Sequence, residues 1–267
     1  MITSQTNAQI KAVIRLQKSA KERRKQKLFV AEGIKLVTEA ASYGKLQKVY
    51  VSETMWEEEV KDDVFGGCGY DVVADKVFAS MSETVTPQGV LGLVRMPGYE
   101  LETILADQNR SILLLDDLRD PGNLGTIMRT AEGAGMSGVI LSRESVDLFN
   151  PKVVRSTMGA IFRVPFYYAE DLAEVIDALK QNQIPVYGTM MQGSIVYDMP
   201  DYKMGAGIVI GNEANGISEK VASHLTQTIR IPMEGSLESL NAAVSAAILM
   251  YEVARQKRTK PLGDLCS

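Results

Sequence analysis

Cysteine and histidine are scarce in this sequence. It contains two cysteines, Cys68 and Cys266, and one histidine, His224, among 267 residues. Their spacing matches neither a disulfide framework nor a Cys/His metal site, so we expect no metal and a reducing compartment. The single histidine falls in an expected helix, away from the polar clusters of the second half. Its position argues against hydrolysis by a histidine-based triad.

Long apolar runs are also absent. No apolar stretch reaches the length that spans a membrane, and Met1 opens a polar segment without a signal-peptide pattern. Hydrophobic residues still make up 45% of the chain, which supports a real core and argues against bulk disorder. The length indicates one large domain or two smaller ones. We therefore expect a soluble protein of a bacterial-type cytoplasm.

The chain as a whole also has no excess of basic residues, because its formal net charge is −4. Positive charge is instead concentrated between Lys11 and Lys27, where Glu22 is the single acid. We expect a helix that runs into a basic loop here. A run of basic residues is usually a solvated helix face. A run with a single acid, in a chain that is acidic as a whole, instead favours contact with a phosphate backbone. The candidate contacts are Lys11, Arg15, Arg23, Arg24, Lys25 and Lys27.

Strands and helices alternate along the chain, which predicts an α/β fold. A small unit comes first, with strands expected at 28–30, 46–51, 70–74 and 89–94 and helices at 32–43 and 55–60. Met96-Pro97-Gly98 interrupts this pattern, and we place the domain boundary between residues 105 and 106. A mainly parallel sheet follows, with strands expected at 111–115, 139–141, 163–168, 184–189, 207–210 and 228–231. Helices between them are expected at 153–161, 171–180, 218–225 and 240–255.

The stretch from Ser111 to Leu141 organises the second domain. An apolar strand ends at Asp116 and Asp117, Pro121 and Gly122 make a turn, and Asn123 is the expected N-cap of a helix. Gly135 suits the position just after that helix. Arg129 lies close to the apolar face of the helix, where its charge calls for an anionic partner. Ligand sites of parallel sheets form at such strand ends.

Three clusters of polar residues and glycine each follow an expected strand. They are Asp120 to Arg129, Gly211 to Ser218, and Pro232 to Asn241. One cluster alone would be an ordinary loop, but three at the same end of one sheet predict a site. Ser239 and Asn241 both suit the N-cap of the last helix, and capping needs only one of them. The segment Gly133 to Gly138 reads G-x-G-x-x-G but ends a helix, so we reject a dinucleotide site there.

These clusters resemble the SpoU (TrmH-like) family of RNA ribose methyltransferases, within the SPOUT superfamily. The first motif is matched by Asn123-Leu124-Gly125-Thr126-Ile127-Met128-Arg129-Thr130. The second is matched by Ile210 to Ile217, with Ala214 where relatives often carry glycine. The third is matched by Ile231-Pro232-Met233 and Ser239-Leu240-Asn241. The resemblance covers roughly 112–256, and the region from Phe29 onward is similar to a ribosomal-protein-like substrate-binding domain.

The resemblance implies a fold, a cofactor and an assembly. The fold is a parallel α/β sheet with a deep trefoil knot, preceded by a smaller α/β domain, here 106–267 and 1–105. The cofactor is S-adenosylmethionine, and family members are homodimers. The cofactor-binding residues would be Thr189, Gly211, Asn212, Ile231 and Leu240. The catalytic residues would be Arg129, Asn123, Glu213, Ser239 and Asn241, and the basic residues named above would bind RNA.

We therefore expect methylation of a ribose 2′-hydroxyl in structured RNA, with 23S ribosomal RNA as the favoured substrate. Transfer RNA is an alternative that the motifs do not separate. A non-catalytic RNA-binding protein on the same fold is a second alternative, although five intact polar motif residues argue against it. A small-molecule α/β enzyme is a third, and the basic segment argues against that.

Overall fold

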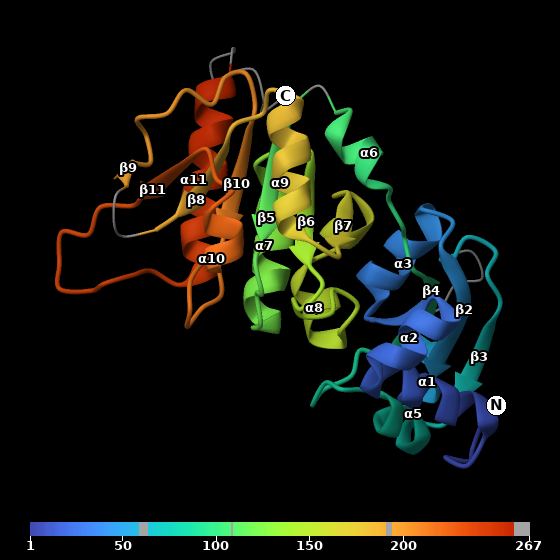
Figure 1. Ribbon diagram of the computed structural model, residues 1–267. Coiled ribbons are helices and arrows are strands. Elements are labelled where there is room, and N and C mark those ends of the chain that lie inside the picture. Colours follow the sequence, from blue (N-terminus) through green and yellow to red (C-terminus); the bar gives the residue numbers. More distant parts are fainter. Residues whose placement is uncertain (59–63, 108, 191–193, 259–267) are drawn as a thin grey trace. The chain divides into compact units, whose positions relative to one another are not determined.

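The computed structural model describes residues 1–58, 64–107, 109–190 and 194–258. Cys266 and the end of the helix expected at 55–60 lie outside these ranges. The chain divides into two compact units (Figure 1). The first unit comprises Met1–Pro97 together with Asp147–Phe162, and the second comprises Gly98–Val146 and the chain from Arg163. The boundary between Pro97 and Gly98 comes before the one expected between residues 105 and 106. The reason is that helix α6 (Leu101–Leu105) places Ile104 in the core of the second unit.

The first unit is built on a four-stranded sheet in the order β1-β4-β2-β3. Its strands are β1 (Leu28–Glu32), β2 (Leu46–Ser52), β3 (Tyr70–Val73) and β4 (Val90–Arg95). Strand β4 runs antiparallel to β1 and β2, whereas β2 and β3 are parallel. The helices are α1 (Ala8–Lys18), α2 (Ala20–Gln26), α3 (Ile34–Ser42), α4 (Glu53–Glu58) and α5 (Asp75–Met81). Apolar faces of α1 and α5 pack on this sheet through Ile10, Leu16, Phe78 and Met81.

The basic segment differs from the expected loop, because it forms helix α2. Ser19 caps this helix by accepting a hydrogen bond from the Glu22 backbone N–H at 3.2 Å. Arg23 is buried in the first unit, with 3% of its surface exposed. Its guanidinium donates to Asp147 Oδ2 at 2.6 Å and to the Leu16 and Gln17 carbonyls. Arg23 is therefore a structural residue and is removed from the candidate RNA contacts.

Residues 147–162 leave the second sheet and pack with the first unit. Helix α8 (Pro151–Ser156) and the 3₁₀ turn η1 (Ala160–Phe162) replace the single helix expected at 153–161. The break lies at Met158 and Gly159, which both have positive φ, at 51° and 89°. The aromatic ring of Phe29 packs against Phe149 and Phe162, which anchors this segment on β1.

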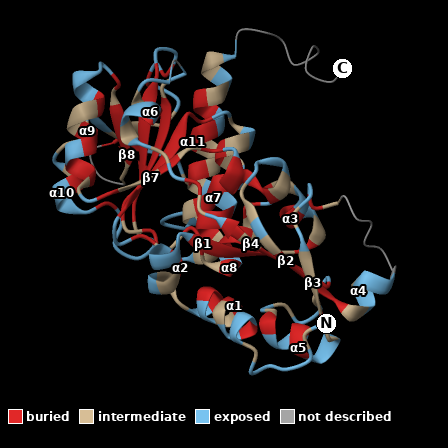
Figure 2. Ribbon diagram, turned by 90° about the vertical axis from the view of Figure 1, so that its right-hand side faces the viewer, coloured by how far each residue is buried: buried red, intermediate tan, exposed pale blue. Residues whose placement is uncertain are grey.

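The second unit contains a seven-stranded parallel sheet in the order β7-β6-β5-β10-β8-β11-β9. Its strands are β5 (Ser111–Leu115), β6 (Gly138–Ser142), β7 (Phe166–Ala169), β8 (Val186–Thr189), β9 (Ile195–Val196), β10 (Ala206–Ile210) and β11 (Gln227–Arg230). All residues of β5, β6 and β10 are buried. Figure 2 draws strands of this unit in red, the colour of buried residues. Such strands need helices on both faces.

Helices cover both faces of this sheet. Helices α9 (Leu172–Gln181) and α10 (Glu219–Ala222) pack with α6 in one core, against Ile112, Leu114, Ile140 and Val209. Helix α7 (Pro121–Gly133) contacts α11 (Ala242–Lys257), and α11 in turn contacts β10. The sheet order places β10 between β5 and β8, so the loops after β5 and β10 begin side by side. The deep trefoil knot implied by the family resemblance stays a prediction.

Within the described residues, no helix has both the length and the apolar character needed to cross a membrane.

Candidate active site

The first motif begins at the N-terminus of α7. Asp120, rather than the expected Asn123, is the N-cap, because its carboxylate accepts the Asn123 backbone N–H at 2.7 Å. Pro121 follows at the first helical position, where its missing N–H costs nothing. Asn123 lies inside the first turn and is 8% exposed. Its side chain is therefore free of capping and turned to other partners.

Glu213 of the second motif binds this helix start. Its carboxylate accepts the Asn123 amide at 2.9 Å and the backbone N–H groups of Arg119 and Asp120 at 3.1 and 3.0 Å. Burial alone would raise the pKa of Glu213, but these hydrogen bonds to the ionised form outweigh it and lower the pKa below its ordinary value. Glu213 is thus held as a carboxylate that fixes the loop before α7.

Asn241 of the third motif completes a chain of side chains. Its amide donates to Asn123 Oδ1 at 3.0 Å, and its own oxygen accepts the backbone N–H groups of Ala243 and Val244. Asn241 is therefore the N-cap of α11 and a link to α7. The order Glu213–Asn123–Asn241 joins all three motifs, which are far apart in the sequence.

The loop after β10 turns back on itself. Backbone hydrogen bonds of 2.9 Å connect Asn212 and Gly216 in both directions. A side chain at Gly211 would meet the Gly216 carbonyl carbon at 2.2 Å, so glycine is required there. The Asn212 side chain donates to the Asp117 carbonyl at 2.8 Å and accepts from the Ala214 and Asn215 backbone. This loop is thereby fixed to the end of β5.

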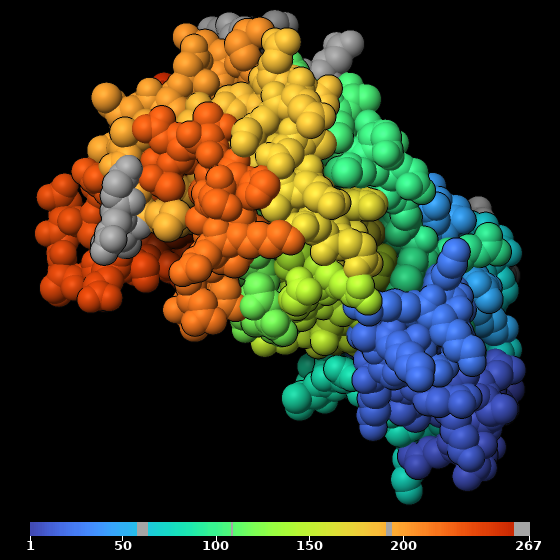
Figure 3. All heavy atoms as spheres, in the orientation of Figure 1, coloured from blue at the N-terminus to red at the C-terminus, as the bar shows by residue number. Residues whose placement is uncertain are grey.

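Arg129 and Ser239 stand apart from this network. Both are exposed, and neither side chain has a hydrogen bond or ion pair with any of the residues that the structure describes. Glu132, the nearest acid after Arg129 in α7, binds Arg163 instead. The guanidinium of Arg129 therefore remains available to an anionic ligand. Ser239 belongs to the surface segment 231–240 after β11, drawn red-orange in Figure 3.

The expected cofactor residues follow neighbouring strands of the second unit. The β8–β11 register pairs Thr189 with Ile229, two residues before Ile231. The Thr189 hydroxyl donates to the Val209 carbonyl of β10 at 3.3 Å. Leu240 directly precedes Asn241, and Thr189, Ile231 and Leu240 are all half-buried. The ends of β8, β10 and β11 thus carry Thr189, Gly211 and Ile231 in adjacent positions.

The remaining basic candidates lie on the surface of the first unit. Lys11, Arg15, Arg24, Lys25 and Lys27 are exposed. They come from α1, α2 and the residue that ends α2. Within the described ranges, no group of three or more His, Cys, Asp or Glu side chains is arranged to hold a metal.

Residues 110–251 match the sequence model of the SpoU rRNA methylase family. The chain belongs to that family. Residues 7–92 match a second description, the MRM3-like substrate binding domain. The family resemblance of the motifs is therefore confirmed, and with it the expectation of a methyltransferase.

Individual relatives of this SpoU-family protein cover nearly its full length. It is 35% identical over 87% of its chain and 91% of the relative to a 23S rRNA (guanosine(2553)-2′-O)-methyltransferase, RlmP, of Bacillus subtilis. An AdoMet-bound rRNA methyltransferase from Sinorhizobium meliloti superposes with a TM-score of 0.85 at 32% identity, over 97% of this chain and 98% of the other. The AdoMet complex of AviRb, a SpoU methyltransferase from Streptomyces viridochromogenes, gives 0.84 at 26% identity, with 94% and 98% covered.

The residues of this SpoU-family chain fit an adenosine-containing cofactor. Half-buried apolar side chains at Ile231 and Leu240 suit the faces of a ring, and strand-end backbone groups near Thr189 and Gly211 suit its polar edges.

Sequence reasoning missed several residues that shape the site. The Asp116 carboxylate accepts the Ser218 backbone N–H at 2.7 Å, which ties the loop after β10 to β5. Asp117 has a positive φ of 57°, and its N–H donates to Ser142 Oγ at 2.9 Å. The pair Asp120-Pro121 was a usable signal for the true N-cap, because proline favours the first helical position. No pattern in the sequence near Asp116 or Asp117 predicts the contacts that these two residues make.

Proposed function

We propose that this SpoU-family chain methylates a ribose 2′-hydroxyl of 23S ribosomal RNA, with S-adenosylmethionine as methyl donor. The observation that carries the proposal is the Glu213–Asn123–Asn241 chain, which joins the three motifs at the base of the helix that bears Arg129. Support comes from the relative named as a 23S rRNA 2′-O-methyltransferase. An enzyme with this substrate would work in the cytoplasm.

The cofactor would be held by Thr189, Gly211, Asn212, Ile231 and Leu240. When bound, it supplies a methyl group activated by a positively charged sulfur. Transfer of that methyl group to the ribose oxygen would leave the sulfur as a neutral thioether, and the hydroxyl proton would pass to solvent. The residues of the chain have to present the ribose oxygen to the methyl group and to stabilise the negative charge that develops on the oxygen.

Arg129 is the residue with the right chemistry for that charge. A guanidinium stays protonated in proteins, so it acts as a hydrogen-bond donor and cation rather than as a base. Exposed and without a protein partner among the described residues, it can bind the ribose oxygen and the neighbouring phosphate. Ser239 adds an exposed hydroxyl that can position the ribose.

Glu213 is better suited to positioning than to proton transfer. Its carboxylate already accepts three hydrogen bonds. Its lowered pKa makes it a weak base at neutral pH. It orients Asn123 and the loop before α7, and Asn123 in turn orients Asn241.

We also propose that the active protein is a homodimer. Helix α11 buries one apolar stripe in the monomer through Ala243, Ala246 and Met250. A second stripe remains open, with Val244 48% and Tyr251 49% exposed and Ile248 half-buried between them. An apolar stripe of this kind suits a second copy of the chain. The first unit, through its basic surface, would bind the RNA.

Mapping of 2′-O-methyl groups in cellular RNA, with and without this protein, tests the function. A 23S rRNA site that loses its methyl group with the protein, and regains it when the gene is restored, is the expected result. Loss of 2′-O-methyl groups from transfer RNA alone would show that the substrate is transfer RNA and not 23S rRNA. An unchanged methylation map, together with no S-adenosylmethionine binding in calorimetry, would remove the enzyme proposal.

A further inference from the structure

We propose that a cavity of the first unit binds an unstacked base of the substrate RNA by its lactam edge, the N–H beside a C=O that guanine and uracil share. The proposal rests on the proposed function, because it takes RNA as the ligand. The cavity has a volume of about 380 Å³. That volume lies within the usual range of small-ligand pockets. We call it the base pocket, and its lining includes Glu32, Leu36, Thr84, Gln88, Arg155 and Met158.

Three separate parts of the first unit build the base pocket. Glu32 is the last residue of β1, and Gly33 turns the chain into α3 with a φ of 99°. Thr84 and Gln88 belong to the segment before β4, and Arg155 belongs to α8. The pocket therefore forms only because residues 147–162 pack with the first unit.

Two oppositely charged groups with unmet hydrogen bonds, called here the unmet pair, lie in the pocket wall. Glu32 Oε1 accepts a hydrogen bond from the Thr84 hydroxyl at 2.6 Å and another from Ser82. Glu32 Oε2 and Arg155 Nη1 form an ion pair at 3.7 Å, a distance too long for a hydrogen bond. Both of these atoms are buried and have no hydrogen-bond partner among the residues that the structure describes. Buried donors and acceptors of native proteins are rarely left so, because each costs free energy.

The charges around the pocket argue for a neutral ligand. The lining contains two acids, Glu32 and Glu39, and two cations, Lys35 and Arg155, so it offers no net attraction for a phosphate. The unmet acceptor of Glu32 requires a donor, and the unmet donor of Arg155 requires an acceptor beside it. Guanine presents N1–H next to O6, and uracil presents N3–H next to O4. Single-stranded RNA bases are commonly recognised along this edge.

Access to the pair depends on Arg155. The Arg155 side chain is 30% exposed, whereas that of Glu32 is 6% exposed. Rotation of the arginine side chain would separate Nη1 from Oε2 and let the edge of a base enter between them. Leu36 and Met158 supply apolar surface for its faces, and Met158 is 47% exposed. Flipped bases are held by this combination of edge hydrogen bonds and apolar contacts.

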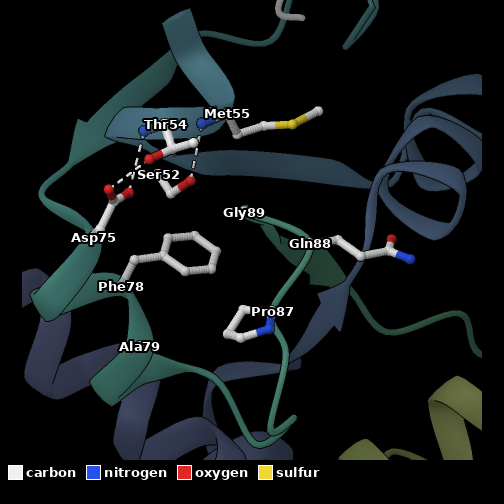
Figure 4. A pocket seen from close by; sticks show the side chains of 9 residues that line it. All are labelled: Ser52, Thr54, Met55, Asp75, Phe78, Ala79, Pro87, Gln88 and Gly89. Carbon is white, nitrogen blue, oxygen red and sulfur yellow. Dashed lines mark hydrogen bonds between the residues drawn. The ribbon is translucent and has the colours of Figure 1, made fainter. Parts of the chain in front are cut away.

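A second cavity of the first unit gives a useful contrast (Figure 4). It has a volume of about 400 Å³ and is lined by Phe78, Pro87 and Asp75 among others. Asp75 accepts hydrogen bonds from the backbone and hydroxyl of Thr54, so its carboxylate is partnered. Gln88 lines both cavities, and in Figure 4 its amide points away from Phe78. The partnered Asp75 carboxylate thus contrasts with the unmet pair of the base pocket.

Binding of short RNA by the full chain tests the proposal. The probes are fluorescein-labelled hexanucleotides of adenosine in which one central base is A, C, G or U, measured by fluorescence anisotropy. A single G or U should bind about tenfold more tightly than A or C, the scale of one bidentate base contact. Methylation of guanine N1 or uracil N3 removes the N–H and should abolish the gain. The larger gain identifies which of the two bases the pocket takes.

Two protein variants sharpen this result. Glu32→Gln should lose the preference for G and U while keeping the affinity for the all-adenosine probe. Asp75→Asn, in the other cavity, should keep the preference. Equal binding of all four bases, or a preference that survives base methylation, would overturn the proposal. The methylated probes decide the question even if Glu32→Gln does not fold.

Calorimetry with S-adenosylmethionine on the same preparations separates the two proposals. Base selectivity without cofactor binding would leave the base pocket and remove the methyltransferase function. Cofactor binding and methyl transfer without base selectivity would support the methyltransferase function and remove the base pocket.

Discussion

The amide of Asn241 donates a hydrogen bond to Asn123 Oδ1 across 3.0 Å, although 118 residues separate the two asparagines. The same Asn241 side chain caps α11. Its two roles can be separated, because aspartate is also a good N-cap but has no amide donor.

Asn241→Asp should therefore keep the stability of the protein and lose most methyl transfer. Asn241→Ala should lose both, with a decrease of about 1 kcal/mol in the free energy of unfolding. Urea denaturation measures the stability and labelled methyl transfer measures the activity. Full activity of a folded Asn241→Asp protein would show that the link to Asn123 is dispensable.

The lowered pKa of Glu213 predicts an acid-dependent contribution to stability. A carboxylate with a depressed folded pKa stabilises the fold above its ordinary value of 4.5, and loses this contribution as pH falls through the folded pKa. Glu213→Gln should thus melt at a lower temperature than the unchanged protein at pH 7, and the gap should narrow toward pH 3. Thermal melts across this range provide the measurement. A gap that is constant with pH would contradict the assignment.

The exposed basic residues of α2 should supply much of the RNA affinity. Arg24→Ala with Lys25→Ala should weaken binding and lower the salt slope by about 0.7 to 0.9 for each phosphate that the variant no longer neutralises. Lys76→Ala with Lys203→Ala removes the same charge from exposed positions outside the basic segment and is the matched control. If the two double variants change RNA affinity and its salt slope equally, the basic segment is only a solvated helix face. Cofactor affinity should be unchanged in both.

The open stripe of α11 should be the dimer contact. Tyr251→Asp places a charge in that stripe and should yield a monomer in sedimentation at micromolar concentration, together with a loss of activity. Met204→Asp makes the same type of change at a residue that is 76% exposed elsewhere in the second unit, and should remain dimeric. If the protein without substitutions is a monomer and is fully active, the proposal that the active form is a homodimer is wrong.

Local patterns predicted most strands and the motif positions, because both depend on neighbours in sequence. The buried strands β5, β6 and β10 all lie where their apolar runs indicated. Helices α5 and α6 were missed, since each is short and its apolar face is completed by tertiary packing.

Long-range contacts explain the main corrections. Arg23 resembled its basic neighbours in sequence, yet it is buried because Asp147, 124 residues away, lies beside it. No pattern near either residue reveals that pairing. The same holds for the Glu213–Asn123 contact, although the family motifs had already singled out both residues.

Arg129 offers the most direct test of the central claim, that its guanidinium stabilises the developing charge on the ribose oxygen. The measurement is single-turnover transfer of a labelled methyl group to unmethylated 23S rRNA by Arg129→Ala and Arg129→Lys, with cofactor affinity determined on the same proteins. We predict that Arg129→Ala slows transfer at least about 100-fold, that Arg129→Lys restores part of the rate, and that both bind S-adenosylmethionine normally. Near-normal transfer by a folded, dimeric Arg129→Ala protein would contradict the account.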